Sequence, residues 1–344
     1  MSTQEATIRQ STLTPDRIMQ LGFGYWGSKT LLSAVELGLF TELAKGPQDA
    51  ESLWQSLRIH PRGAGDFFDA LVALGMLERH DGQYSNTPET DLFLDRAKPS
   101  YSGGFLEMSS MRLYRFWADL TEGLRTGEPQ NEAKTGGNLF DVIYRDPALL
   151  KEFAHAMTGI SMGTAKAIAQ KFPWSKYRTF ADLGAAEGCL PVELAMANPH
   201  LSGIGFDLPP LAPIFDEYVA SFDLTERVHF SGGDFFADPL PQADVLIYGR
   251  VLHDWSPAEK HTLLARAYSA LPQGGALLVY ETILDDDRRN NAFGLLMSLN
   301  MLIETRAGAD YTRAECASWM RDVGFRETWA EHLLGADSMV VGIK

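Results

Sequence analysis

The sequence predicts a two-domain protein, in which a mainly helical winged-helix domain precedes an α/β domain with a doubly wound parallel sheet. Apolar residues recur at three- and four-residue spacing through residues 16–175, which is typical of packed helices. From about Tyr177 the pattern changes to short apolar strands that alternate with helical segments, which is typical of βαβ units. With 344 residues and 45% hydrophobic content, the chain is long enough to bury two cores.

The N-terminal half begins with an amphipathic helical segment. In GSKTLLSAVELGLFTEL, residues Leu31, Leu32, Val35, Leu39 and Phe40 form one wide apolar stripe. A stripe of this width is buried against a partner helix in a folded domain. We therefore expect the first core of the chain here.

A winged-helix pattern follows the stripe. Helical patterns cover Ala50–Leu57 and Gly63–Leu77, and Asp81-Gly82 then lies between two short alternating segments, which indicates a tight hairpin. Winged helices often bind DNA, but the segment expected to be the recognition helix, PRGAGDFFDALVALGML, carries one basic residue, Arg62, and two aspartates. A structural or dimerisation role is therefore favoured over DNA binding.

The C-terminal half contains five predicted strands. They cover residues 179–184, 202–207, 228–232, 244–249 and 276–281. Because helical or loop segments separate them, the strands should form a parallel, Rossmann-like sheet that binds its ligand at the strands' carboxyl ends. Two capping boxes mark helix starts in this half, Ser256 with Glu259 and Thr312 with Glu315.

The composition excludes several classes of protein. Cys189 and Cys316 are the two cysteines, too few for a disulfide framework or a structural zinc site, so a reducing cytoplasm is the simplest compartment. The N-terminus lacks a signal-peptide pattern, and no apolar stretch approaches the roughly 20 residues that span a bilayer. The net charge of −15 would repel phosphate backbones. We expect a soluble, unprocessed cytoplasmic protein without a nucleic-acid or membrane partner.

A candidate cofactor loop follows the first strand, over Asp182–Gly188 (DLGAAEG). Glycines at a strand-to-helix turn let a ligand approach the backbone, although a purely structural turn has the same composition. The second strand ends in Asp207, 23 positions after Gly184 (207 − 184), where a carboxylate can accept from both ribose hydroxyls of an adenine nucleoside. NAD would use the same geometry. The loop does not match G-x-G-x-x-G, however, so an adenosine ligand without phosphates fits better.

The next two strands add candidates for binding and for proton transfer. Asp234 and Phe235 end the third strand, where they can recognise an adenine amino group and ring, unless the phenylalanine belongs to the core. His253 follows the fourth strand and is the side chain best suited to take a proton near neutral pH. Glu281 ends the adjacent fifth strand, so its carboxylate could hold the imidazole in the correct tautomer.

Six motifs in this order resemble the signature of the small-molecule O-methyltransferases related to plant caffeate, isoflavone and acetylserotonin methyltransferases and their bacterial natural-product relatives. The motifs are DLGAAEG, FDLPP, GGDFF, VLHDW, LLVYETIL and GADYTRAECASWMRDVGF. LGLFTELAKGP and LVALGMLERHDGQYSNTPET also resemble that family's dimerisation domain. The resemblance covers about residues 20–344. It implies a homodimer with a winged-helix dimerisation domain (1–110), linker and substrate helices (111–176) and an S-adenosylmethionine-binding methyltransferase domain (177–344).

The resemblance also implies roles for individual residues. Those implied to bind S-adenosylmethionine are Asp182, Gly184, Gly188, Asp207, Leu208, Asp234, Phe235, Gly249 and Arg250. The catalytic residues are His253 as the base, flanked by Glu281 and Asp310. The acceptor site is expected to involve Phe116, Trp117, Met157, Asp254, Met297, Asn300, Met301 and Glu304, although methionines at helical spacing are equally typical of a core. No metal is expected.

Three positions depart from the family's pattern. Ala186 replaces the middle glycine of the loop, and Gly249 stands where plant members carry a lysine, which leaves only backbone contacts there. Asp310 aligns with the second flanking glutamate and is one methylene shorter, so it has to reach further to contact His253.

The resulting hypothesis is methyl transfer from S-adenosylmethionine to a hydroxyl of a small aromatic acceptor, which leaves S-adenosylhomocysteine. Nitrogen, carbon and carboxylate acceptors stay open, because residues far apart in the sequence form the acceptor site. Two other hypotheses remain: a relative that binds the cofactor but catalyses a non-methylating reaction, and a winged-helix regulator that senses a nucleoside. The pair His253 and Glu281 argues against the first, and the acidic recognition helix against the second.

Overall fold

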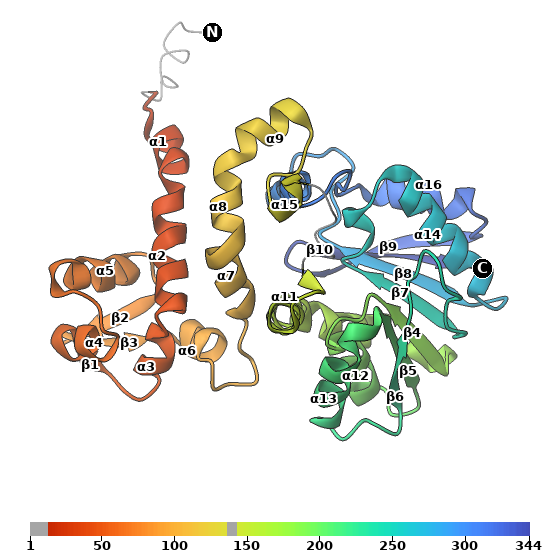
Figure 1. Ribbon diagram of the computed structural model, residues 1–344, viewed down its shortest axis with the longest axis horizontal. Coiled ribbons are helices and arrows are strands. Elements are labelled where there is room, and N and C mark those ends of the chain that lie inside the picture. The colour runs from red at the N-terminus through yellow and green to blue at the C-terminus, as the bar shows by residue number, and fades with distance from the viewer. Residues whose placement is uncertain (1–12, 136–142) are drawn as a thin grey trace, which may run out of the picture. The chain divides into compact units, whose positions relative to one another are not determined.

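The computed structural model describes residues 13–135 and 143–344, and the chain divides into two compact units, residues 1–110 and 111–344 (Figure 1). The expectation of an unprocessed N-terminus concerns residues 1–12 and lies outside the described residues. In the part of the chain that the structure describes, no helix combines the length and apolarity needed to cross a membrane.

The first unit is a small helical domain with a three-stranded sheet. Its helices are α1 (Asp16–Gly22), α2 (Gly24–Glu36), α3 (Leu39–Leu43), α4 (Ala50–Ser56), α5 (Pro61–Ala73), α6 (Pro88–Leu94) and α7 (Gly104–Met108). The strands β1 (Gln48–Asp49), β2 (Leu77–His80) and β3 (Gln83–Asn86) form an antiparallel sheet in the order β1-β3-β2.

The predicted hairpin is confirmed. Asp81 and Gly82 both have positive φ, 50° and 78°, as a two-residue turn of this kind requires. The prediction of a helix over Gly63–Leu77 is wrong at both ends: the helix begins at Pro61, with His60 as its N-cap, and ends at Ala73. Leu77 instead begins β2 and packs in the core of this unit.

The second unit begins with short helical segments and then a long helix. Their bounds are η1 (Ser109–Leu113, which starts in the first unit), α8 (Tyr114–Phe116), η2 (Trp117–Asp119), α9 (Leu120–Thr126), η3 (Glu132–Thr135), α11 (Pro147–Lys171) and η4 (Trp174–Lys176). Asp146 caps α11 by accepting from the backbone N–H groups of Ala148 and Leu149. The helix contributes Ala165 and Ile168 to the hydrophobic core on one face of the sheet described next.

The sheet of the second unit has seven strands in the order β6-β5-β4-β7-β8-β10-β9. Its strands are β4 (Thr179–Leu183), β5 (Ser202–Asp207), β6 (Val228–Gly232), β7 (Val245–Gly249), β8 (Ala276–Glu281), β9 (Glu327–Leu334) and β10 (Asp337–Ile343). The five predicted strands are confirmed and are parallel. The antiparallel β9 and β10 were not predicted, because no helix separates them and the polar residues of β9 follow no regular alternation.

Helices cover both faces of this sheet (Figure 1). The remaining helical segments of this unit are α12 (Cys189–Ala197), η5 (Pro209–Leu211), α13 (Ala212–Ala220), η6 (Leu252–Asp254), α14 (Pro257–Ala270), α15 (Ala292–Glu304) and α16 (Arg313–Asp322). Leu246 and Tyr248 of β7 point to the face covered by α14 and α16, whereas Val245 and Ile247 point to the face covered by α11 and α12. This alternation is the period of two expected of strands buried on both faces.

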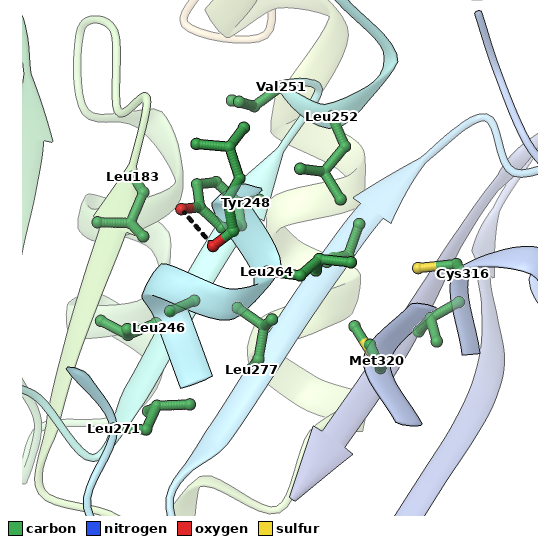
Figure 2. Close-up of a cluster of buried hydrophobic side chains, with 14 of the residues drawn as sticks. Leu183, Leu246, Tyr248, Val251, Leu252, Leu264, Leu271, Leu277, Cys316 and Met320 are labelled. Carbon is green, nitrogen blue, oxygen red and sulfur yellow. Dashed lines mark hydrogen bonds between the residues drawn. The ribbon is translucent and has the colours of Figure 1, made fainter. Parts of the chain in front are cut away.

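Figure 2 shows the side chains of the first face, with Leu183, Leu246 and Leu277 of the strands beside Leu264 of α14. Both predicted capping boxes are formed, at Ser256 and Thr312. Because these caps fix where α14 and α16 begin, they also set the position of the loops that precede the two helices.

Candidate active site

The predicted cofactor loop lies at the carboxyl end of β4. Gly184, Ala186 and Gly188 all have positive φ, at 93°, 48° and 99°. A Cβ at Gly184 would lie 2.6 Å from Cγ2 of Val251, so a side chain cannot be placed there. Ala186 adopts the left-handed conformation despite its side chain, and its backbone N–H donates to Asp207 at 2.9 Å.

Asp207, at the carboxyl end of β5, is the centre of a buried hydrogen-bond set. Its carboxylate accepts from the backbone N–H of Ala186, from that of Leu208 at 2.7 Å and from the Tyr144 hydroxyl at 3.0 Å. Burial raises the pKa of Asp207, and these three donors lower it. Tyr144 was missed in the sequence, since nothing in VIYRDP indicates that it reaches a strand end 63 residues later.

Two more acids belong to the same loop. Asp182 is buried, and this burial together with the Asp207 charge raises its pKa to about 8. Glu187 is also buried and lies 3.5 Å from Nδ1 of His155 on α11. The loop region therefore presents carboxyl groups, which suit a cationic ligand and disfavour a pyrophosphate.

The ends of β6 and β7 hold the remaining predicted cofactor residues. Asp234 accepts from the backbone N–H of Phe236 at 2.7 Å. Phe235 and Phe236 are both half-buried and contact Trp255 edge-on, so both pack against the core. A Cβ at Gly249 would lie 2.2 Å from the Tyr280 ring, which explains why no lysine stands at this position.

Arg250 is held by partners that the sequence did not indicate. Its guanidinium donates to Asp337 at 2.5 Å, and the Thr164 hydroxyl donates to the same carboxylate oxygen at 2.6 Å. The pair is buried, with 7% and 9% of the two side chains exposed. Asp337 begins β10 and Thr164 lies on α11, so the fold brings together segments from both ends of this unit.

His253 lies on η6, shortly after β7, among three acids, of which Glu281 and Asp310 are buried and Asp254 is partly exposed. Its Nδ1 lies 3.2 Å from Oδ1 of Asp310, and its backbone N–H donates to Oε1 of Glu281 at 3.1 Å. Nε2 lies 3.8 Å from Oδ1 of Asp254. The prediction that Glu281 fixes the tautomer is therefore wrong in detail: Asp310 contacts the ring nitrogen, and Glu281 holds the main chain of the same residue.

The charges of these acids determine the protonation of the ring. Burial lowers the pKa of His253, but Glu281, Asp254 and Asp310 outweigh it and raise the pKa to about 10. Burial raises the pKa of Asp254 to about 7, while the imidazolium of His253 opposes this shift. Burial likewise raises the pKa of Glu281. The resting imidazole therefore carries a proton at neutral pH, balanced by the surrounding acids.

This cluster also has ligand atoms close enough together to hold a metal. Within residues 13–135 and 143–344, His253, Glu281 and Asp310 are the one such group, with the ligand atoms all within 4.8 Å of one another. Asp310 occupies the position beside Nδ1, and Glu281 already accepts from the main chain. Both the proton-transfer role of the cluster and the absence of a metal requirement stay predictions.

The predicted acceptor residues lie on four separate segments, around Phe116, on α11, on η6 and on α15, and some of them are in contact. The Trp117 indole N–H donates to Oδ1 of Asn300 at 2.8 Å. Glu304 is buried and pairs with Arg112 at 3.3 Å, and the Arg112 guanidinium lies 5.5 Å from the Phe116 ring centroid. Arg112 was missed in the sequence, where a single arginine in a helical pattern carries no signal.

The predicted methionines differ in exposure. Met157 on α11 and Met297 on α15 are half-buried, whereas Met301 is buried. The first two thus keep surface for a ligand, and Met301 fits the alternative interpretation as a core residue.

Comparison with protein families gives two matches. A model described as the O-methyltransferase domain matches residues 117–326, and one described as the O-methyltransferase dimerisation domain matches residues 19–96.

Individual relatives match nearly the whole chain. The tetracenomycin polyketide synthesis 8-O-methyl transferase TcmO of Streptomyces glaucescens is 45% identical, over 96% of this chain and 97% of its own. The N,N-dimethyltransferase OxyT of Streptomyces rimosus is 39% identical, over 95% and 96%. The crystal structure of human N-acetylserotonin methyltransferase in complex with SAM superposes with a TM-score of 0.89 at 30% identity, covering 97% of this chain and 99% of that one.

Proposed function

Because the chain belongs to the O-methyltransferase family, we propose that it transfers a methyl group from S-adenosylmethionine to a hydroxyl of an aromatic, polyketide-like acceptor. His253 is the general base of this proposal, and S-adenosylhomocysteine is the second product. The relative TcmO supports the acceptor class by its name. The observation that carries the proposal is the contact between Nδ1 of His253 and Asp310.

The residues around the β4 loop fit this cofactor. When bound, S-adenosylmethionine supplies a methyl group on a positively charged sulfur, which an oxygen nucleophile can displace. Glu187 and Asp207 attract such a cation, and the left-handed loop leaves its backbone open to a ligand. The residues proposed to hold it are Asp182, Gly184, Gly188, Asp207, Leu208, Asp234, Phe235, Gly249 and Arg250.

His253 is suited to remove the acceptor's proton through Nε2. Asp310 at Nδ1 favours the tautomer whose proton is on Nδ1, so Nε2 of the neutral ring is the acceptor atom. Glu281 fixes the main chain of His253, and the three acids stabilise the imidazolium. Because the same acids keep the ring protonated at neutral pH, the neutral base becomes more abundant as the pH rises towards about 10. A phenol has a pKa of roughly 10, so such a base contributes about 10²–10⁴ in rate.

The remaining acceleration comes from holding the acceptor oxygen in line with the methyl group. We propose that Trp117 and Asn300, joined by a hydrogen bond, present polar and aromatic surface to the acceptor. Phe116, Met157, Asp254, Met297, Met301 and Glu304 are proposed to complete the acceptor site. Glu304 would act through its ion pair with Arg112, which ties α15 to the segment around Phe116.

A second candidate function is transfer to nitrogen, which the relative OxyT favours by its name. A panel of hydroxylated and amino-substituted naphthalenes and tetracenes, incubated with methyl-labelled cofactor, separates the two. Label in an O-methyl product supports the first proposal, and label on nitrogen supports the second. Cofactor binding without labelled product would point to a non-methylating reaction, and retention of duplex DNA would favour a regulator.

We also propose that the protein works as a cytoplasmic homodimer, with a small-molecule acceptor and without a nucleic-acid or membrane partner. The match to a dimerisation domain supports the homodimer. The net charge of −15 argues against binding phosphate backbones or anionic lipids.

A further inference from the structure

Lys260 on α14 is a buried lysine close to the acid cluster. Only 3% of the residue is exposed, and its Nζ donates to the backbone carbonyl of Ala309 at 2.7 Å. The ring centroids of Tyr311 and Trp319 lie 5.2 and 5.9 Å from Nζ. A buried ammonium group is costly unless nearby charge or ring faces stabilise it, so its position here requires an explanation.

The carbonyl that Lys260 binds belongs to the residue before Asp310. The backbone N–H of Asp310 donates to the Ser298 hydroxyl at 3.1 Å, so α14 and α15 both hold this segment. A Cβ at Gly308 would lie 2.5 Å from the His253 carbonyl oxygen, which shows that the segment packs directly on the main chain of the base. The short Asp310 side chain therefore reaches Nδ1 from a backbone that Lys260 helps to fix.

Lys260 adds a second cation to the acid cluster around His253. Glu281 and Asp310 are buried, and Asp254, with 15% of its side chain exposed, is the third carboxyl group beside the imidazole. In the described part of the chain, Oε2 of Glu281 and Oδ2 of Asp310 have no hydrogen-bond partner. Burial raises the pKa of Asp254 and Glu281, and a nearby positive charge offsets the negative charge that the acids carry. Lys260 interacts electrostatically with the same three acids.

We propose that Lys260 is a positioning residue for the base: it fixes the backbone from which Asp310 contacts His253, and its charge offsets the buried acids around the imidazole. This inference rests on the proposed role of His253 as the general base. Lys260 would thus affect catalysis although its side chain does not touch the reacting atoms.

A change of charge at Lys260 should alter the proton affinity of His253. The groups that face Lys260 or His253 are Asp254 on η6, Glu281 on β8, Asp310 and Tyr311 after α15, and Glu315 and Cys316 on α16. Loss of one positive charge leaves the imidazolium more strongly stabilised by the acids. The neutral base then forms only at higher pH.

The test is the pH profile of kcat/KM for methyl transfer in Lys260→Met, with cofactor affinity measured in parallel. We expect the ascending limb of this profile to shift to a pH about one unit higher. A charge several ångströms away in a protein interior changes a pKa by about this amount. Lys260→Arg should leave the limb in place, because it keeps the charge. Lys166→Met is the matched control: it removes one charge from a side chain that is 57% exposed.

The variants separate positioning from stability. If Lys260→Met lowers activity equally at all pH values without moving the limb, Lys260 is merely structural and the inference is wrong. Lys260→Gln is shorter and also neutral, so it should shift the ascending limb in the same direction. This variant takes the place of Lys260→Met if Lys260→Met does not fold. If neither neutral variant folds, a shifted limb in Lys260→Arg contradicts the inference and an unshifted one supports it. Undiminished transfer in His253→Gln would instead overturn the proposed function.

Discussion

The charge state of His253 is the residue-scale feature on which the proposed chemistry depends. Its pKa of about 10 lies above the ordinary value of 6.5, because the charges of the neighbouring acids exceed the effect of burial. A raised pKa means that the folded state binds the proton more tightly than the unfolded chain. The resulting stability is complete below pH 6.5 and is lost as the pH rises through about 10.

The upward shift of the His253 pKa gives a prediction for the variant His253→Gln. The stability advantage of the unaltered protein over the variant should be largest near pH 6 and should shrink as the pH approaches 10. Thermal unfolding of both proteins at several pH values measures the difference. A difference that stayed constant or grew over this range would contradict the raised pKa.

Asp207 gives a second prediction at the residue scale. Asp207→Ala removes the acceptor of three hydrogen bonds and the group proposed to bind the ribose. Calorimetric titration with S-adenosylhomocysteine should show weakening of about tenfold or more, as loss of a charged hydrogen-bond acceptor costs roughly 1.5–3 kcal/mol. Tyr144→Phe removes one of the donors and leaves the carboxylate, so it should weaken binding less. Unchanged affinity in the alanine variant would remove the ribose assignment.

Sequence reasoning indicated the candidate site but not the contacts within it. Asp207 and His253 follow predicted strands, and parallel strands place their carboxyl ends at one edge, so their proximity follows from the pattern. The pattern does not predict that Asp310 contacts the imidazole while Glu281 binds the backbone N–H of His253. These contacts depend on side-chain directions in a loop. Tyr144 and Lys260 were not identified for the same reason: Tyr144 contacts Asp207 across 63 positions of the sequence, and Lys260 contacts Ala309 across 49.

At the scale of elements, capping decides how precisely helices begin. Ser256 and Thr312 each accept from the backbone N–H three residues later, within a reciprocal capping box. Ser256→Ala and Thr312→Ala should each lower the free energy of unfolding by about 1 kcal/mol. Chemical denaturation measures this change, and Ser269→Ala, whose hydroxyl bonds only a carbonyl within α14, is the control. Equal stability of the cap variants and the control would contradict the capping account.

The strands show which elements the hydrophobic pattern of a sequence can predict. β7 and β8 are apolar runs because both faces of the sheet are covered there, and such runs stand out in the sequence. β9 is partly exposed at the edge of the sheet, and its glutamates and histidine obscure the pattern. The helix over residues 63–77 was extended too far because Met76 and Leu77 are apolar at helical spacing, although the chain there turns into a strand.

The whole molecule is expected to be a homodimer, and the first unit offers the surface. Ile18, Leu21 and Trp26 on its first two helices are 74%, 84% and 59% exposed, which is costly in water. Sedimentation should give the mass of two chains, and Ile18→Glu combined with Leu21→Glu should give one. Met196→Glu, at a residue of the second unit that is 52% exposed, should stay dimeric. A dimer that survives the double substitution would place the interface elsewhere.

The account of the whole molecule as a methyltransferase depends most on His253. The direct measurement is the single-turnover rate of methyl transfer, with saturating S-adenosylmethionine and an acceptor from the labelled panel, in the unaltered protein and in His253→Gln. We predict a rate at least two orders of magnitude lower in the variant, with cofactor affinity within about threefold. An undiminished rate at equal cofactor occupancy would contradict the role of His253 as the base.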